Sequence, residues 1–281
     1  MGERVIRKVP AVTLFFWIAK IVTTAQGEAT SDYLVHTISP YLAVGLGALG
    51  ITVALVWQLS LRRYVAPVYW FAVTMVAVFG TMAADAAHIE LGIPYAVSSA
   101  VCAAGLAVIF GLWYLSERTL SIHSIDTRRR ELFYWAAVLA TFAMGTAVGD
   151  LTAYTLHLGF LSSGLMFTVI FAIPFAARHL AGLGEVVAFW SAYVITRPLG
   201  ASYADWFGVP RILGGLGYGS GTVAVVLTVA IGALVGYFGI TKVDVENGIV
   251  TGPELAEGQA LEVVGPRAQG SGGESATSPP S

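Results

Sequence analysis

The sequence predicts an all-α polytopic membrane protein, with eight transmembrane helices built as four helical-hairpin repeats of the same topology. Apolar residues make up 56% of the 281 residues and charged residues only 11%, whereas an average soluble domain carries about 25% charged residues. In addition, a pattern of Trp, Gly and Asp recurs four times along the chain. This composition excludes a soluble globular enzyme, a disordered protein and a nucleic-acid-binding protein.

The apolar segments are long enough to cross a bilayer, which takes roughly 20 residues in a helix. Eight such segments are present, at residues 10–34, 41–60, 66–87, 95–115, 132–154, 160–177, 186–205 and 218–240. The Lys and Arg residues that flank these segments fall on one side, with the exception of Arg211. By the positive-inside rule both termini are therefore expected in the cytoplasm.

The chain divides into three parts. Residues 1–9 form a short cytoplasmic N-terminus, and residues 10–240 form the eight-span membrane domain. Residues 241–281 are rich in Gly, Ser, Pro, Ala and Glu, a composition that cannot bury a core, so they are predicted to be a disordered cytoplasmic tail.

The repeated pattern begins with an aromatic residue followed by Trp, in the pairs Phe16-Trp17, Tyr69-Trp70, Tyr134-Trp135 and Phe189-Trp190. Ten residues after each Trp is a glycine (Gly27, Gly80, Gly145 and Gly200), and five residues later an aspartate (Asp32, Asp85, Asp150 and Asp205). The repeats cover about 10–61, 66–116, 131–178 and 185–240. Because each repeat holds two spans, all four enter the membrane the same way round, and the four Asp residues are expected at one depth. The Trp residues are expected in an interfacial aromatic belt.

Each repeat glycine is followed four residues later by another small residue. Stripes of small residues let membrane helices approach closely. The first helices of the four repeats are therefore predicted to pack against one another around a shared axis.

The repeat also resembles a known group. Its motifs include Val9-Pro10-Ala11, Arg129-Arg130-Glu131 and Thr196-Arg197-Pro198-Leu199-Gly200. Over roughly residues 8–240 the chain resembles an uncharacterised bacterial membrane-protein family defined by a hairpin repeat of unknown function that occurs four times. The resemblance implies an eight-span inner-membrane protein and implies no particular activity.

Seven ionisable residues lie inside the predicted spans, where charges are costly and usually mark a site or a pathway. Five are acids that could bind a cation or carry protons: Glu28, Asp32, Asp85, Asp150 and Asp205. Two are bases, Lys20 and Arg197, which are interpreted as charge partners that neutralise a neighbouring acid or gate the site. Alternatively, the repeated Asp residues cap the turns that follow them.

Three histidines follow the acids at helical spacings and could add metal ligands: His36, His88 and His157. His36 lies four residues after Asp32, and His88 three residues after Asp85, spacings that share a helix face. Imidazole together with carboxylate suits a transition metal such as Mn or Zn.

The chain shows no catalytic motif, so no enzymatic activity and no resident cofactor are expected. The sequence favours a secondary transporter or exporter of a small inorganic cation, and a divalent metal ion is the candidate. The expected partner is the lipid bilayer, and no nucleic acid is expected as a partner. The alternative is a structural, sensor or accessory membrane protein whose Asp residues serve only the outer turns. The sequence does not address the oligomeric state.

Overall fold

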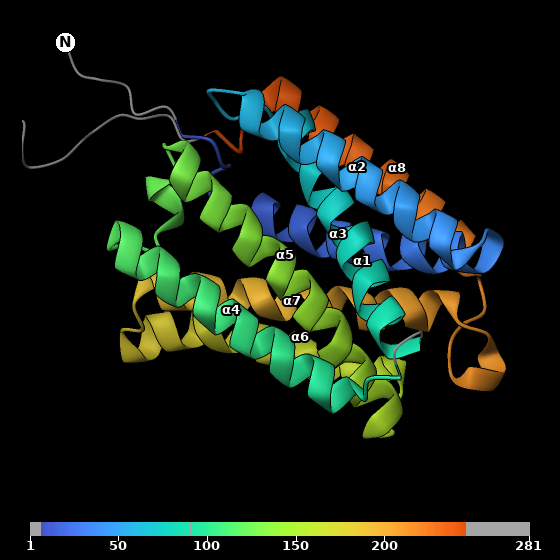
Figure 1. Cartoon of the computed structure of the whole chain (residues 1–281). Helices are drawn as coiled ribbons and strands as arrows, with labels where there is room; N and C mark the ends of the chain where they lie inside the picture. The colour runs from blue at the N-terminus through green and yellow to red at the C-terminus, as the bar shows by residue number, and fades with distance from the viewer. Residues whose placement is uncertain (1–6, 90–91, 246–281) are drawn as a thin grey trace, which may run out of the picture. The chain divides into compact units, whose positions relative to one another are not determined.

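A computed structural model describes residues 7–89 and 92–245, which form eight long α-helices (Figure 1). Their bounds are α1 Leu14–Thr37, α2 Pro40–Ser60, α3 Ala66–Ile89, α4 Tyr95–Glu117, α5 Arg128–Asp150, α6 Phe160–Ala181, α7 Glu185–Gly208 and α8 Ser220–Thr241. Short helical turns occupy η1 Ile122–Ser124, η2 Leu151–Thr155 and η3 Arg211–Leu213. Residues 1–6 of the predicted N-terminus and 246–281 of the predicted tail lie outside the described residues.

The helices form an inner ring and an outer set. The inner helices α1, α3, α5 and α7 close a ring, because α1 packs on α3, α3 on α5, α5 on α7 and α7 on α1. The outer helices α2, α4, α6 and α8 pack mainly on α3, α5, α7 and α1, respectively. Each outer helix therefore rests chiefly on the first helix of the next repeat, and the predicted hairpin is not the main packing unit.

Six of the eight helices, all except α1 and α7, are long and apolar enough to cross a membrane. The outer helices also present exposed apolar side chains, among them Leu49, Val101, Val169 and Val229, each more than half exposed. In water such a surface would be unfavourable, whereas in lipid it is the expected one. The chain is thus a helical protein of the multi-pass membrane type.

The repeat glycines lie where the inner helices touch. A Cβ added at Gly27 would lie 2.3 Å from the Cβ of Ala77 on α3, closer than two carbon atoms can approach. The other three glycines meet their neighbours in the same way: Gly80 against Phe142, Gly145 against Arg197, and Gly200 against Thr24. Each partner stands three residues before the next repeat glycine, so one contact recurs four times and closes the ring.

The four repeat tryptophans are buried in the bundle, so the predicted interfacial belt is wrong. Their exposed fractions lie between 1% and 8%. The aromatic residue before each Trp packs against the Trp of the next repeat, with ring centroids 5.9 Å apart for Phe16–Trp70, 5.6 Å for Tyr69–Trp135, 6.1 Å for Tyr134–Trp190 and 5.7 Å for Phe189–Trp17. Because the inner helices approach closely, these rings gain more by packing on each other than by facing lipid.

A buried polar cluster closes the end of the bundle nearest the tryptophans. Lys8 forms an ion pair of 2.6 Å with Glu131, and both side chains are buried. Gln58 donates a second hydrogen bond of 3.0 Å to the same carboxylate. Glu131, at the start of α5, thereby holds the segment around Lys8 against the bundle.

The first residues of the predicted tail reach the same end. The buried Asp244 accepts a hydrogen bond from the Tyr64 hydroxyl, and its backbone carbonyl accepts one of 2.8 Å from the Ala11 N–H. Tyr64 lies in the connection between α2 and α3, outside the apolar helices. Burial, and then the bond to the Asp244 carboxylate, raise the pKa of the Tyr64 hydroxyl well above its usual range.

This raised pKa predicts a loss of stability at high pH. In the unfolded chain Tyr64 ionises near pH 10, while in the folded chain it stays neutral, so its contribution is complete below pH ~10 and declines above it. Tyr64→Phe cannot ionise and should therefore lose less stability than the wild type between about pH 10 and 11. Chemical unfolding of both proteins at each pH measures the difference, and parallel curves would contradict the prediction.

Candidate cation site on the helix axis

The axis of the inner ring is filled by side chains in layers. Equivalent residues of the four inner helices, taken at steps of four along each helix, make up these layers, and contacts between the helices join their members. The layer nearest the tryptophans is the aromatic layer (Phe16, Tyr69, Tyr134, Phe189), and the layer at the opposite end is the acid ring (Asp32, Asp85, Asp150, Asp205). Three layers lie between them. In order from the aromatic layer they are Lys20, Val73, Val138 and Tyr193; Thr24, Ala77, Phe142 and Arg197; and Glu28, Thr81, Thr146 and Ala201. Apart from Asp32 and Asp85, all of these side chains are buried.

The acid ring brings the predicted acids together. Glu28, Asp32 and Asp205 each offer a carboxylate oxygen, and these oxygens lie within 4.8 Å of one another. Asp85 and Asp150 are close enough for their carboxylates to repel each other and Glu28. Acids from all four repeats therefore share one region, with Asp32 and Asp85 partly exposed at its rim.

The ring aspartates are not the N-cap residues of the outer helices that follow them. Asp32, Asp85 and Asp205 lie inside their own helices, and Asp150 ends α5. The N-cap residues of α2, α4, α6 and α8 are Ser39, Pro94, Gly159 and Gly219. Asp150 precedes the π-helical turn η2, but its side chain makes no capping hydrogen bond there.

Arg197 lies beneath the acid ring and joins all four inner helices. Its Nη2 forms an ion pair with Glu28 and donates hydrogen bonds to Thr81 and to Thr146, the last at 2.7 Å. Its Nη1 donates to the backbone carbonyl of Thr24 at 3.4 Å. The predicted pairing of Arg197 with an acid is thus present, and it involves Glu28 rather than an aspartate.

Lys20 lies one layer deeper than Arg197 and has a different environment. Its ammonium nitrogen is 3.9 Å from the ring centroid of Phe142 and 4.2 Å from that of Tyr193. Aromatic faces stabilise a cation that has left water. Among the described residues no carboxylate forms an ion pair with Lys20, so the aromatic rings replace the acid partner that the sequence predicted.

The three predicted histidines do not join the acids. The Nδ1 of His36 contacts the backbone carbonyl of Asp32 at 2.6 Å, and not its carboxylate. The Nδ1 of His88 contacts the Ile93 carbonyl, and its ring stacks on Tyr95. At the end of η2, His157 is exposed with a left-handed backbone (φ 56°), because the α-helix on which its predicted position depended has ended. Within residues 7–89 and 92–245, the one group of three or more clustered ligands contains no histidine.

Sequence reasoning missed the two threonines that bind Arg197. Thr81 and Thr146 directly follow repeat glycines, at the position that Glu28 occupies in the first repeat. Aligning the repeats on their glycines would have found them as the polar members of one layer. Buried threonines are common in helices, however, so the alignment alone does not identify these two as hydrogen-bond partners of Arg197. The position of Arg197 in the folded bundle does.

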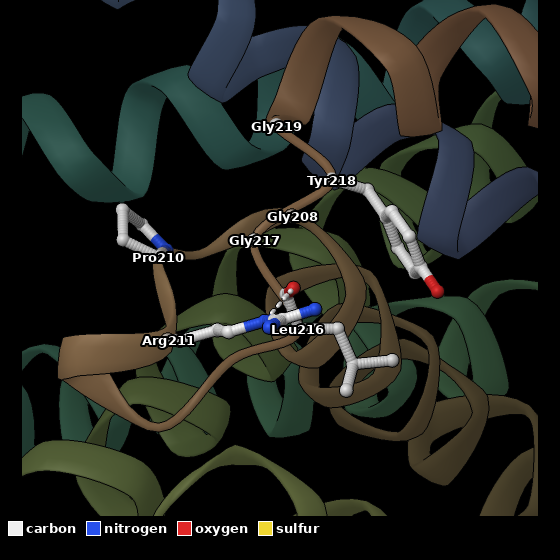
Figure 2. Close-up of a pocket in the computed structure, with 7 residues that line it drawn as sticks. All are labelled: Gly208, Pro210, Arg211, Leu216, Gly217, Tyr218 and Gly219. Atoms are coloured by element: carbon white, nitrogen blue, oxygen red, sulfur yellow. Dashed lines mark hydrogen bonds between the residues drawn. The ribbon is translucent and has the colours of Figure 1, made fainter.

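A separate pocket of about 350 Å³ lies outside the axis, in the connection between α7 and α8 (Figure 2). Figure 2 shows the Arg211 side chain extending across this pocket, where its Nε donates a hydrogen bond of 3.2 Å to the Leu216 carbonyl. The lining residues are Gly208, Pro210, Arg211, Leu216, Gly217, Tyr218 and Gly219. None of the predicted site residues lines this pocket.

Comparison with known proteins supports the repeat and identifies no activity. The family model described as Repeat of Unknown Function (DUF347) matches residues 68–119, 133–182 and 188–243. These ranges correspond to the second, third and fourth repeats, and the first repeat is recognised by its motif and by its equivalent contacts in the ring. No curated protein and no solved structure matches the chain.

Proposed function

The chain belongs to the DUF347 family of repeats of unknown function, and from the residues on its helix axis we propose that it is a secondary transporter or exporter of a cation. The observation that carries the proposal is the convergence of Glu28, Asp32 and Asp205, whose carboxylate oxygens lie within 4.8 Å of one another. Three carboxylates at that distance repel one another unless a cation or protons compensate them.

The proposal includes the membrane topology. All eight helices cross a bacterial inner membrane, both termini are cytoplasmic, and the four repeats have the same topology. The helices α1 and α7 are less apolar than the other six because Lys20, Glu28 and Arg197 lie on them, and these side chains are buried in the bundle and do not face lipid. The charges therefore do not oppose insertion of the folded bundle.

The balance of charge on the axis favours a cation as the ligand. Five acids stand against Lys20 and Arg197, and Arg197 is already paired with Glu28. Carboxylate oxygens are ligands for Mg²⁺, Ca²⁺ and Mn²⁺. Since no histidine joins the cluster among the described residues, we favour an oxygen-liganded ion such as Mn²⁺ over Zn²⁺.

The packing of the axis suits a carrier that opens to one side at a time. At the rim, Asp32 and Asp85 are partly exposed. Toward the other end, Arg197, Lys20 and the aromatic layer are buried and fill the axis. Many secondary transporters built from repeats hold their ligand between such an open and a closed end. We assign the protein no enzymatic reaction and no resident cofactor.

Removal of the ring charges tests this function. Asp85→Asn and Asp150→Asn should each abolish Mn²⁺-dependent flux in proteoliposomes that carry a proton gradient, because the amide keeps the size of the side chain and removes its charge. Asp126→Asn, which changes a partly exposed carboxylate outside the axis, is the matched control and should transport like the wild type. Unchanged flux in both ring variants would exclude transport through these carboxylates.

The same variants address the alternative of a structural, sensor or accessory protein. Under that alternative the ring aspartates only stabilise the bundle. Asp85→Asn and Asp150→Asn would then lower the yield of folded protein, and the wild type would carry no flux. Size-exclusion chromatography of each variant in detergent measures the folded yield in parallel with the flux.

A further inference from the structure

One nitrogen atom of Arg197 is bound by oxygens from three different helices. Its Nη2 contacts Glu28 on α1, Thr81 on α3 and Thr146 on α5. The three oxygens come from the same position of three repeats, directly after the repeat glycine. In the fourth repeat this position is Ala201, which offers no side-chain oxygen, and Arg197 reaches the point from the layer below. The fold therefore converges three oxygens on the axis and fills the point between them with a positive charge.

We infer that Glu28, Thr81 and Thr146 form a cation-binding site, which we call the arginine site, and that Arg197 occupies it as a tethered cation. The site lies directly beneath the acid ring. Its occupation by Arg197 is independent of transport. The further step, in which the transported cation competes with Arg197 for Glu28, rests on the proposed function and specifies how that function would be gated.

Glu28 connects the two sites. Its carboxylate pairs with Arg197, and it also lies within 4.8 Å of the ligand oxygens of Asp32 and Asp205. A cation that binds between these three acids draws charge from the same carboxylate that holds Arg197. Glu28 can therefore satisfy the guanidinium or the incoming ion fully, but not both.

The surroundings of Arg197 hold it in place and also leave it incompletely bonded. Its stem runs along Gly145, where an added Cβ would lie 2.3 Å from the arginine Cγ. The side chain is only 1% exposed, yet its Nε has no hydrogen-bond partner among the described residues. Lys20 and Arg197 lie over the same Phe142 ring, with the Lys20 nitrogen 3.9 Å and the guanidinium carbon 5.5 Å from its centroid. The hold on the guanidinium thus depends on the oxygens of the arginine site.

These contacts give Arg197 the role of a gate. While it occupies the arginine site, the guanidinium separates the acid ring from the deeper layers of the axis. A cation bound at Glu28 weakens the ion pair that holds the arginine on the axis.

Chemical rescue tests the site without any assumption about transport. In Arg197→Ala the three oxygens remain, and the space of the guanidinium is vacant. Millimolar guanidinium chloride should bind there and raise the thermal midpoint of the purified variant by about 2–4 °C, the shift expected for a modest ligand of a protein of this size. The wild type, and Arg178→Ala, which removes a partly exposed arginine on α6, should show no rise.

The double variant Glu28→Gln/Arg197→Ala separates specific binding from a general solvent effect. It lacks the carboxylate that attracts guanidinium and should not respond. An equal response of the double variant and of Arg197→Ala, or no response of Arg197→Ala, would overturn the inference.

If Arg197→Ala does not fold well enough to purify, the yield of folded protein becomes the measurement. Cell-free synthesis into lipid nanodiscs, with and without guanidinium, should give a higher folded yield of Arg197→Ala with guanidinium and an unchanged yield of the double variant. The absence of this gain would overturn the inference as well. A positive rescue together with absent Mn²⁺ flux would retain the arginine site and reject the transport function, so the two failures are distinguishable.

Discussion

Glu28→Gln is expected to destabilise the folded chain by about 3–5 kcal/mol, the cost of breaking a buried ion pair by removing one partner. The substitution keeps the shape of the side chain and leaves the guanidinium of Arg197 without a counter-charge in a place where it is only 1% exposed. Thr81 and Thr146 continue to accept hydrogen bonds from it, but neutral hydroxyls compensate a buried charge poorly. Thermal or chemical unfolding in detergent measures the loss.

Asp126→Asn is the matched control for this prediction. It also converts a carboxylate that binds an arginine into an amide, but the pair of Asp126 and Arg130 lies at the surface, with side chains 40% and 25% exposed. Exposed ion pairs contribute at most about 1 kcal/mol, because water already solvates both charges. Equal destabilisation by the two substitutions would show that the buried ion pair contributes no more to the free energy of unfolding than the exposed one.

Gly27→Ala is expected to destabilise the inner ring by about 1–3 kcal/mol or more, the usual cost of adding a methyl group to a packed contact. The new Cβ would lie 2.3 Å from the Cβ of Ala77 and 2.9 Å from its backbone carbonyl carbon. A backbone atom cannot move out of the way alone, so α1 and α3 must separate. The same separation displaces Glu28, the next residue, from Arg197.

Gly236→Ala provides the contrast in the same measurement. Gly236 lies inside α8, and an added Cβ there meets no atom within 4 Å. Alanine is favoured over glycine inside a helix by about 1 kcal/mol, so this variant should be as stable as the wild type or more stable. A similar loss of stability in both variants would mean that the repeat glycines reflect helix propensity and not the close approach of the inner helices.

Much of the helical framework could be predicted from local sequence. The apolar segments predicted all eight helices, and six of these, all except α1 and α7, have the length and hydropathy of a membrane span. The stripe of small residues predicted that the first helices of the repeats pack together, and the structure places Gly27, Gly80, Gly145 and Gly200 at those contacts. These features depend on residues within one or two helical turns of each other, and such periodicity is visible in the chain itself.

The details of the site could not be predicted in the same way. Sequence reasoning selected Arg197 and Glu28 as buried charges but did not pair them, since they are separated by 169 positions. It placed the tryptophans at an interface, and the histidines near the acids, from rules that apply to isolated helices. In the ring, the rotation of each helix turns the tryptophans inward, and the end of α5 in a π-helical turn directs His157 away.

The sequence by itself determined that this chain is a helical membrane-type protein with a repeated unit and with acids at equivalent positions of each unit. Only the tertiary structure decided that the outer helix of one repeat packs on the next repeat, and that one arginine binds oxygens from all three other inner helices. The physical reason is that hydrophobicity and helical period are set by neighbouring residues, whereas the partners of a buried charge are set by the rotation and closure of helices that are far apart in the chain.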